Sequence, residues 1–218
     1  MNKKAIILLS GGLDSLVALG FPQNDYKIEL ALTFDYGQKS AEYEIKASKK
    51  ICDYYKIKHK IINLDWLKEV THTALVSSNE LPKEMDKNSA KAVWVPNRNG
   101  LFLNIAGAIA DGENFDYILI GANKEEAQTF SDNSKDFIDS INKEFKFSTQ
   151  KKPEVIAPLL NFDKNDIVKL ALDNHIPLEL VHSCYAKGEK HCGKCESCKR
   201  LKNALKNNND EYYIGKLF

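Results

Sequence analysis

Short apolar segments alternate with helical patterns along the 218 residues of this chain. The continuous apolar run from Ala5 to Leu9 stops at Ser10-Gly11-Gly12, which is typical of a strand buried on both faces of a parallel sheet. Four more strands are predicted at 29–34, 59–63, 117–121 and 154–157. Helices are predicted at 14–19, at 41–55, at 99–110, from 131 to 144, and after Asp163, which is a favourable N-cap.

This alternation of strands and helices predicts a doubly wound α/β domain, with a five-stranded parallel sheet, over residues 1–180. Ligands of such domains bind at the carboxyl ends of the strands, so polar residues that follow a strand are the candidates for a site. Residues 71–95 lack a period and are expected to form a long loop. Residues 181–218 are expected to form a Cys-rich segment followed by a C-terminal helix.

The composition narrows the classes of function. The chain has 31 Lys and Arg against 30 Asp and Glu, and 43% of its residues are hydrophobic. It therefore has the apolar content of a folded core and lacks the basic excess of a nucleic-acid-binding domain. Its apolar runs are too short for a membrane span or a signal peptide. We expect a cytoplasmic protein with reduced cysteines and with neither membrane nor nucleic-acid partners.

The turn after the first predicted strand is rich in groups that bind phosphate. Its sequence is Ser10-Gly11-Gly12-Leu13-Asp14-Ser15, between a strand and the start of a helix. Two glycines let the backbone turn tightly and approach an anion, while backbone N–H groups and hydroxyls supply donors. Asp14 would repel a bare phosphate, so we expect it to hold the loop together or to contact Mg²⁺. No Gly-Lys-Ser/Thr follows, which excludes a Walker A loop.

The sequence SGGLDS at this position resembles the PP-loop of the N-type ATP pyrophosphatases. That family cleaves ATP between its α and β phosphates, and the loop cradles the pyrophosphate that leaves. The resemblance implies that loop donors hold the phosphates and that the end of the second strand lies beside adenine. The residues expected to contact ATP are Leu8, Leu9, Ser10, Gly11, Gly12, Leu13, Asp14, Ser15, Leu16, Val17, Ala18, Asp35 and Tyr36.

Four of the five cysteines have the spacing C-x7-C-x2-C-x2-C, at Cys184, Cys192, Cys195 and Cys198. Four thiolates complete a tetrahedral Zn²⁺ site and leave no open position, which indicates a structural metal. An iron–sulfur cluster stays open as an alternative, because CxxCxxC also serves such clusters. The fifth cysteine, Cys52, lies on the apolar face of a predicted helix and is expected in the core.

The PP-loop and the cysteine pattern together resemble the QueC family of queuosine biosynthesis, the 7-cyano-7-deazaguanine synthases. Other motifs extend the match over most of the chain. They are FDYGQ at 34–38, VPNRNGLFL at 95–103, Pro158-Leu159 with Lys164, PLEL at 177–180 and SCY at 183–185.

This resemblance implies an ATP-dependent carbon–nitrogen ligase. It would convert 7-carboxy-7-deazaguanine and ammonia to the nitrile through an adenylated carboxylate and an amide. Asp14, Arg98 and Lys164 are the expected catalytic residues. The residues expected to contact the deazaguanine are Arg98, Asn123, Phe130 and Asp132, with Phe130 stacked on the base and Asp132 accepting from its guanine-like edge. One structural Zn²⁺ per chain, Mg²⁺ with the ATP, and a homodimer are also implied.

One segment departs from the family pattern and leaves alternatives open. The family carries GVN and then a stretch containing DYSGYPDCR, whereas here Gly121-Ala122-Asn123 is followed by EAQTFSDNS at 126–134. The alternatives are a QueC paralogue that uses another acceptor amine and a PP-loop enzyme that thiolates tRNA. A non-catalytic nucleotide-binding module is disfavoured by the intact SGGxDS. No residues for a glutaminase stand out, so free ammonia or a separate partner is the expected nitrogen source.

Overall fold

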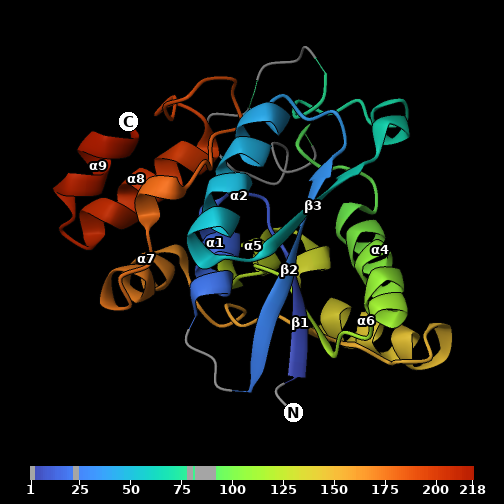
Figure 1. Cartoon of the computed structure of the whole chain (residues 1–218). Coiled ribbons are helices and arrows are strands. Elements are labelled where there is room, and N and C mark those ends of the chain that lie inside the picture. Colours follow the sequence, from blue (N-terminus) through green and yellow to red (C-terminus); the bar gives the residue numbers. More distant parts are fainter. Residues whose placement is uncertain (1–2, 22–24, 78–80, 82–91) are drawn as a thin grey trace.

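The computed structural model describes residues 3–21, 25–77, 81 and 92–218. Five parallel strands form one sheet in the order β3-β2-β1-β4-β5 (Figure 1). The strands are β1 (Lys3–Leu8), β2 (Tyr26–Asp35), β3 (Lys58–Asn63), β4 (Tyr117–Leu119) and β5 (Glu154–Ile156). The α/β class and the five-stranded parallel sheet expected from the sequence are thus confirmed.

The central strand β1 is apolar on both faces. Ala5 and Ile7 pack into one buried cluster, while Ile6 and Leu8 pack into another on the opposite face. This is the side-chain alternation of a strand, and it explains why the run is continuously apolar. β1 is hydrogen-bonded to β2 on one side and to β4 on the other.

Helices cover both faces of the sheet, so the fold has three layers (Figure 1). One face carries α1 (Leu13–Gly20), α2 (Ala41–Tyr55), α7 (Lys164–Asp173), α8 (Glu196–Asn207) and α9 (Glu211–Leu217). The other carries α4 (Arg98–Glu113) and α6 (Lys135–Ser148). Short connections are α5 (Lys124–Thr129) and three 3-10 turns at Asp65–Lys68, Ser131–Asn133 and Leu178–Leu180. Within the described ranges, no helix combines the length and the apolar content needed to cross a membrane.

The C-terminal segment packs against the sheet domain. Leu201 and Leu205 of α8 and Leu217 of α9 belong to the same buried cluster as Ile7 and Leu16. Residues 181–218 therefore share an apolar core with the strands that carry the predicted ATP site.

Two helices between β4 and β5 differ from the sequence prediction. The helix expected from residue 131 begins only at Lys135, because Ser134 is its N-cap and accepts a hydrogen bond from Phe137 N–H at 3.2 Å. Helix α5 was not predicted, since its six residues are too few to show a helical period. Most of the predicted loop at 71–95, namely residues 78–80 and 82–91, lies outside the described residues.

The strand order reverses between β1 and β4, and this switch point is where doubly wound sheets bind ligands. The PP-loop follows β1 there, and Gly121 comes shortly after β4. A Cβ atom on Gly121 would lie 2.9 Å from the carbonyl carbon of Asp14 and 2.9 Å from Ser15 N. The glycine therefore lets the end of β4 touch the loop.

Candidate active site

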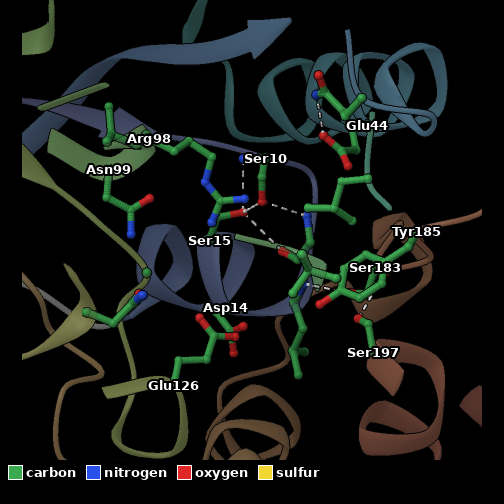
Figure 2. A pocket seen from close by; sticks show the side chains of 18 of the residues that line it. Ser10, Asp14, Ser15, Glu44, Arg98, Asn99, Glu126, Ser183, Tyr185 and Ser197 are labelled. Atoms are coloured by element: carbon green, nitrogen blue, oxygen red, sulfur yellow. Dashed lines mark hydrogen bonds between the residues drawn. The ribbon is translucent and has the colours of Figure 1, made fainter. Parts of the chain in front are cut away.

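A cleft of about 270 Å³ opens beside the PP-loop, at the carboxyl ends of β1, β2 and β4. It collects residues from motifs that are far apart in the sequence (Figure 2). The predicted site residues that line it are Leu8, Leu9, Ser10, Gly12, Leu13, Asp14, Ser15, Tyr36, Arg98, Phe130, Asp132 and Lys164.

Four residues of the predicted ATP set do not line the cleft. Leu16, Val17 and Ala18 of α1 are fully buried in the apolar core. Gly11 is also buried, and its φ of +77° is left-handed; a Cβ there would come within 2.7 Å of Glu44 O. The three α1 residues support the loop from beneath, Gly11 forms part of its turn, and none of the four lines the cleft.

Asp35 and Asn123 are likewise outside the cleft wall. Asp35 Oδ1 accepts a hydrogen bond from Gly37 N–H at 3.0 Å and so stabilises the turn after β2. Asn123 is fully buried, and its Oδ1 accepts the N–H of Glu126 at 3.0 Å as the N-cap of α5. Asn123 Oδ1 therefore serves to begin a helix, and the expected contact of Asn123 with substrate stays a prediction.

The serines of the PP-loop are hydrogen-bonded to the loop itself. Ser15 Oγ donates to Gly12 O at 3.1 Å and accepts from Ser10 N–H at 3.2 Å. Ser10 Oγ lies 3.2 Å from Ser15 Oγ and accepts from Gly12 N–H at 3.3 Å. Behind the loop, Thr33 and Ser48 hydroxyls donate to Leu9 O at 2.7 and 3.2 Å. These bonds hold the turn in one shape before any ligand binds.

Lys164 reaches the start of α1 from the start of α7 and pairs with Asp14. Its Nζ lies 2.8 and 2.7 Å from the two Asp14 carboxylate oxygens and 3.8 Å from Glu126 Oε1. Burial lowers the pKa of Lys164, but Asp14 and Glu126 outweigh this and raise it overall. Burial raises the pKa of Glu126, against the opposing effect of Lys164. The lysine therefore stays charged beside the loop, and Asp14 is engaged by an ammonium group.

Arg98 is the first residue of α4, and the residue before it, Asn97, has a left-handed φ of 50°. Arg98 Nη1 lies 3.4 Å from the Tyr36 hydroxyl, and its guanidinium carbon lies 6.0 Å from the centre of the Tyr36 ring. Burial lowers the pKa of Arg98, yet Tyr36 and nearby carboxylates raise it overall. The guanidinium is thus a permanent cation in the wall of the cleft.

An aromatic pair and a carboxylate lie at the side of the cleft formed by the segment before α6. The Phe130 and Trp94 rings are nearly parallel, with centroids 6.1 Å apart and an interplanar angle of 20°. Asp132 Oδ1 accepts from Asn133 Nδ2 at 3.1 Å, and Asp132 O accepts from Asn99 Nδ2 at 3.2 Å. Burial raises the pKa of Asp132, while Arg98 opposes this change. This side offers flat apolar faces beside a hydrogen-bond acceptor.

The four predicted cysteines come together in one cluster, and their Sγ atoms all lie within 4.8 Å of one another. The Sγ atoms of Cys192 and Cys198 are 3.8 Å apart. Four sulfurs at about 2.3 Å from a tetrahedral ion would be separated by about 3.8 Å, so the cluster fits a metal of that size. Backbone N–H groups of Lys194 and Cys195 also donate to Cys192 Sγ, at 3.4 and 3.3 Å.

Cys52 is separate from this cluster. It is 2% exposed within the apolar core, and burial raises the pKa of its thiol to about 12. The expectation that Cys52 is a core residue is confirmed.

The cysteine segment is joined to the PP-loop by two hydrogen bonds. His182 N–H donates to Gly11 O at 2.8 Å, and Leu13 N–H donates to Ser183 Oγ at 3.0 Å. The cysteine segment therefore forms one wall of the cleft.

The chain resembles one protein family over nearly its whole length. A family model described as queuosine biosynthesis protein QueC matches residues 4–209. The chain belongs to the QueC family. Its curated relatives include a 7-cyano-7-deazaguanine synthase of Methanosarcina mazei, 50% identical over 94% of both chains, and one of Carboxydothermus hydrogenoformans, 48% identical over 93% of this chain and 98% of the other. The family resemblance read from the motifs is confirmed.

Solved structures agree on the fold of this QueC-family protein. A U34-tRNA thiolase, NcsA, from Methanococcus maripaludis has a TM-score of 0.53 at 19% identity, over 96% of this chain and 68% of that one. An NH3-dependent NAD synthetase from Campylobacter jejuni has a TM-score of 0.51 at 14% identity, over 99% of this chain and 79% of that one. At these identities the likeness concerns the fold alone.

Several residues of the QueC-family cleft escaped the sequence analysis. Glu44 lines it from α2, and its carboxylate accepts from Ser40 Oγ at 2.5 Å and from Gln38 Nε2 at 2.8 Å; burial raises its pKa. Tyr185 follows the first cysteine of the cluster, and burial raises its pKa well above the usual value. Tyr185 stands in the SCY motif and Gln38 in FDYGQ. No such signal pointed to Glu44 itself, because a helical period does not show which end of a helix faces a ligand.

Proposed function

We propose that this protein is a 7-cyano-7-deazaguanine synthase, an ATP-dependent carbon–nitrogen ligase. The observation that carries the proposal is a single cleft with a PP-loop on one side and, on another, an aromatic pair beside a carboxylate. The names of the relatives support the same activity. The substrates are 7-carboxy-7-deazaguanine, ammonia and ATP.

The proposed reaction activates the same oxygen-bearing carbon twice. The substrate carboxylate attacks the α phosphorus of ATP and pyrophosphate leaves. Ammonia then attacks the acyl carbon, and AMP leaves as the amide forms. The amide oxygen attacks a second ATP, pyrophosphate leaves again, and loss of AMP and of two N–H protons leaves the nitrile. Each step needs positioned reactants and stabilisation of negative charge on phosphate, which the cleft supplies through donors and cations.

We assign the phosphates of ATP to the loop from Ser10 to Ser15, with Lys164 and Arg98 as the nearby cations. Backbone N–H groups of the loop and the start of α1 favour a polyanion there. Since Lys164 binds both oxygens of Asp14, Asp14 orients the lysine and Mg²⁺ enters with the nucleotide. Tyr36, at the end of β2, then lies on the adenine side.

We assign the deazaguanine ring to the face formed by Phe130 and Trp94. Flat heteroaromatic rings stack favourably on such side chains. Asp132, which is acceptor-only when ionised, lies two residues after Phe130 and suits the N–H donors of a guanine-like edge. Arg98, on the neighbouring wall, is placed to attract the substrate carboxylate.

We propose that the cysteine cluster holds one structural Zn²⁺ through Cys184, Cys192, Cys195 and Cys198. When bound, the ion crosslinks the segment that closes the cleft. His191 is not among the ligands, because its Nε2 accepts from Ser183 N–H at 2.9 Å and its Nδ1 lies 3.2 Å from Leu217 O. Metal analysis tests the assignment, and the visible absorption of a brown iron–sulfur protein would contradict it.

We also propose that the protein acts in the cytoplasm as a homodimer. The reduced cysteine cluster and the family resemblance support this. Exposed apolar side chains at Ile61, Trp66 and Val70, in and after the edge strand β3, offer surface for such contact. Light scattering on the purified protein gives the mass directly.

The test of function is mass spectrometry of a reaction that contains 7-carboxy-7-deazaguanine, ATP, Mg²⁺ and ¹⁵N-ammonium. We expect a labelled nitrile, with Asp132→Asn strongly impaired and the exposed Asp136→Asn equal to wild type. Consumption of ATP only when another amine is supplied would instead identify a paralogue with a different acceptor. ATP consumption that depends on tRNA would identify a thiolating enzyme.

A further inference from the structure

Ser183 lies directly over the PP-loop, although it belongs to the cysteine segment. Its Oγ accepts the N–H of Leu13 at 3.0 Å, and it would be 3.6 Å from a Cβ on Gly12 (Figure 2). Leu13 and Gly12 belong to the turn assigned to the leaving phosphates. The Ser183 hydroxyl therefore borders the place where those phosphates would lie.

The main chain of Ser183 is held on both sides. Its N–H donates to His191 Nε2 at 2.9 Å, and its carbonyl accepts from Ser197 Oγ at 2.6 Å. Both partners lie inside or beside the cysteine cluster. The position of the hydroxyl is consequently set by the cysteine segment as well as by its hydrogen bond to the PP-loop.

The three serines around the loop differ in whether the hydroxyl proton is already used in a hydrogen bond. Ser15 Oγ donates to Gly12 O, and Ser10 Oγ lies within hydrogen-bond distance of Ser15 Oγ, so these two hydroxyls support the turn. Ser183 Oγ accepts from Leu13 N–H but donates to no atom among the described residues. A hydroxyl that accepts from the loop keeps its own proton for an anion.

We propose that Ser183 is a phosphate-binding residue of the ATP site, whose hydroxyl donates to the departing pyrophosphate while it orders the Leu13 amide. This inference rests on the proposed use of ATP. It gives the cysteine segment a direct role in binding ATP, beyond holding a metal. A hydrogen bond to a charged group contributes about 1.5–3 kcal/mol, which corresponds to a change of about 10- to 150-fold in affinity.

The test is calorimetric titration of the metal-loaded protein with MgATP, pyrophosphate and AMP, without the deazaguanine substrate. We expect Ser183→Ala to weaken MgATP and pyrophosphate by about 10-fold or more and to leave AMP unchanged. The matched control is Ser140→Ala, since that exposed hydroxyl donates to Asp136 O on the surface of α6. Equal binding of MgATP by Ser183→Ala and wild type, or equal losses for ATP and AMP, would overturn the proposal.

A second pair of variants tests the proposal if Ser183→Ala does not fold. Ser183→Thr and Ser183→Val have the same shape and differ only in the hydroxyl, so we expect Thr to keep MgATP affinity and Val to lose it; equal affinities would contradict the role. The role of Ser183 in binding MgATP can be tested independently of the proposed nitrile-forming reaction. If wild type makes no nitrile but Ser183 still governs MgATP binding, only the choice of acceptor fails.

Discussion

The contact between Gly121 and the PP-loop yields the sharpest prediction from the structure. Replacing Gly121 with Ala adds a Cβ that would lie 2.9 Å from the Asp14 carbonyl carbon and 2.9 Å from Ser15 N. Both neighbours are backbone atoms, so neither can rotate away and the loop must move. Overpacking of this kind costs about 1–3 kcal/mol of the free energy of unfolding. If about 1.4 kcal/mol of the strain falls on the phosphate loop, ATP affinity drops about tenfold.

Urea unfolding and calorimetric titration with MgATP measure the two effects. The matched control is Gly112→Ala in α4, where an added Cβ meets no atom within 4 Å among the described residues. That substitution removes a helix glycine, so we expect up to about 1 kcal/mol of added stability and unchanged ATP binding. Wild-type stability and ATP affinity in Gly121→Ala would refute the argument that a glycine is required where β4 meets the loop.

Three further predictions test the ion pair, the aromatic face and the thiols. Lys164→Met leaves the Asp14 carboxylate without its partner, so we expect urea unfolding to show a loss of about 3 kcal/mol in the free energy of unfolding. The double variant with Asp14→Asn should recover part of this loss. If the effects of the two substitutions simply add, the pairing is contradicted. Phe130→Ala and Trp94→Ala should each raise KM for the deazaguanine acid about 2- to 10-fold, because a stacked ring pair contributes about 0.5–1.5 kcal/mol. KM for ATP should stay unchanged. Equal changes in both KM values would show that the deazaguanine ring binds elsewhere. Burial raises the pKa of Cys52 to about 12, so this thiol should resist alkylation of the native protein at pH 8. Mass spectrometry should show this resistance even after a chelator has made the other four thiols reactive. Rapid labelling of Cys52 would contradict its burial.

Features that depend on neighbours in the chain could be predicted from the sequence. The run from Ala5 to Leu9 is apolar at every position, and a strand between two helix layers requires this. The PP-loop and the four-cysteine spacing are also local, because a tight turn and a tetrahedral metal restrict residues a few positions apart. Asp163 was recognised as an N-cap for the same reason, and the structure shows its carboxylate accepting from Asn165 and Asp166 N–H.

The segment before α6 shows where local reasoning failed. Ser131, Asp132 and Ser134 are all acceptable N-caps by residue type, and only the observed hydrogen bond selects Ser134. Asn123 has the same ambiguity, since an amide side chain can begin a helix or contact a ligand with equal chemistry. Its full burial and its place at the start of α5 depend on packing and could not be read from the sequence.

The sequence by itself determined the fold class, the family, the PP-loop and the set of four cysteines that cluster in the structure. Tertiary structure alone decided which polar groups meet in the cleft. Lys164 and Asp14 are 150 positions apart, and Leu13 and Ser183 are 170 apart, yet each pair is joined by hydrogen bonds. No period or spacing records such pairs, because they arise only when parallel strands bring their carboxyl ends to one edge of the sheet and the C-terminal segment packs back against it.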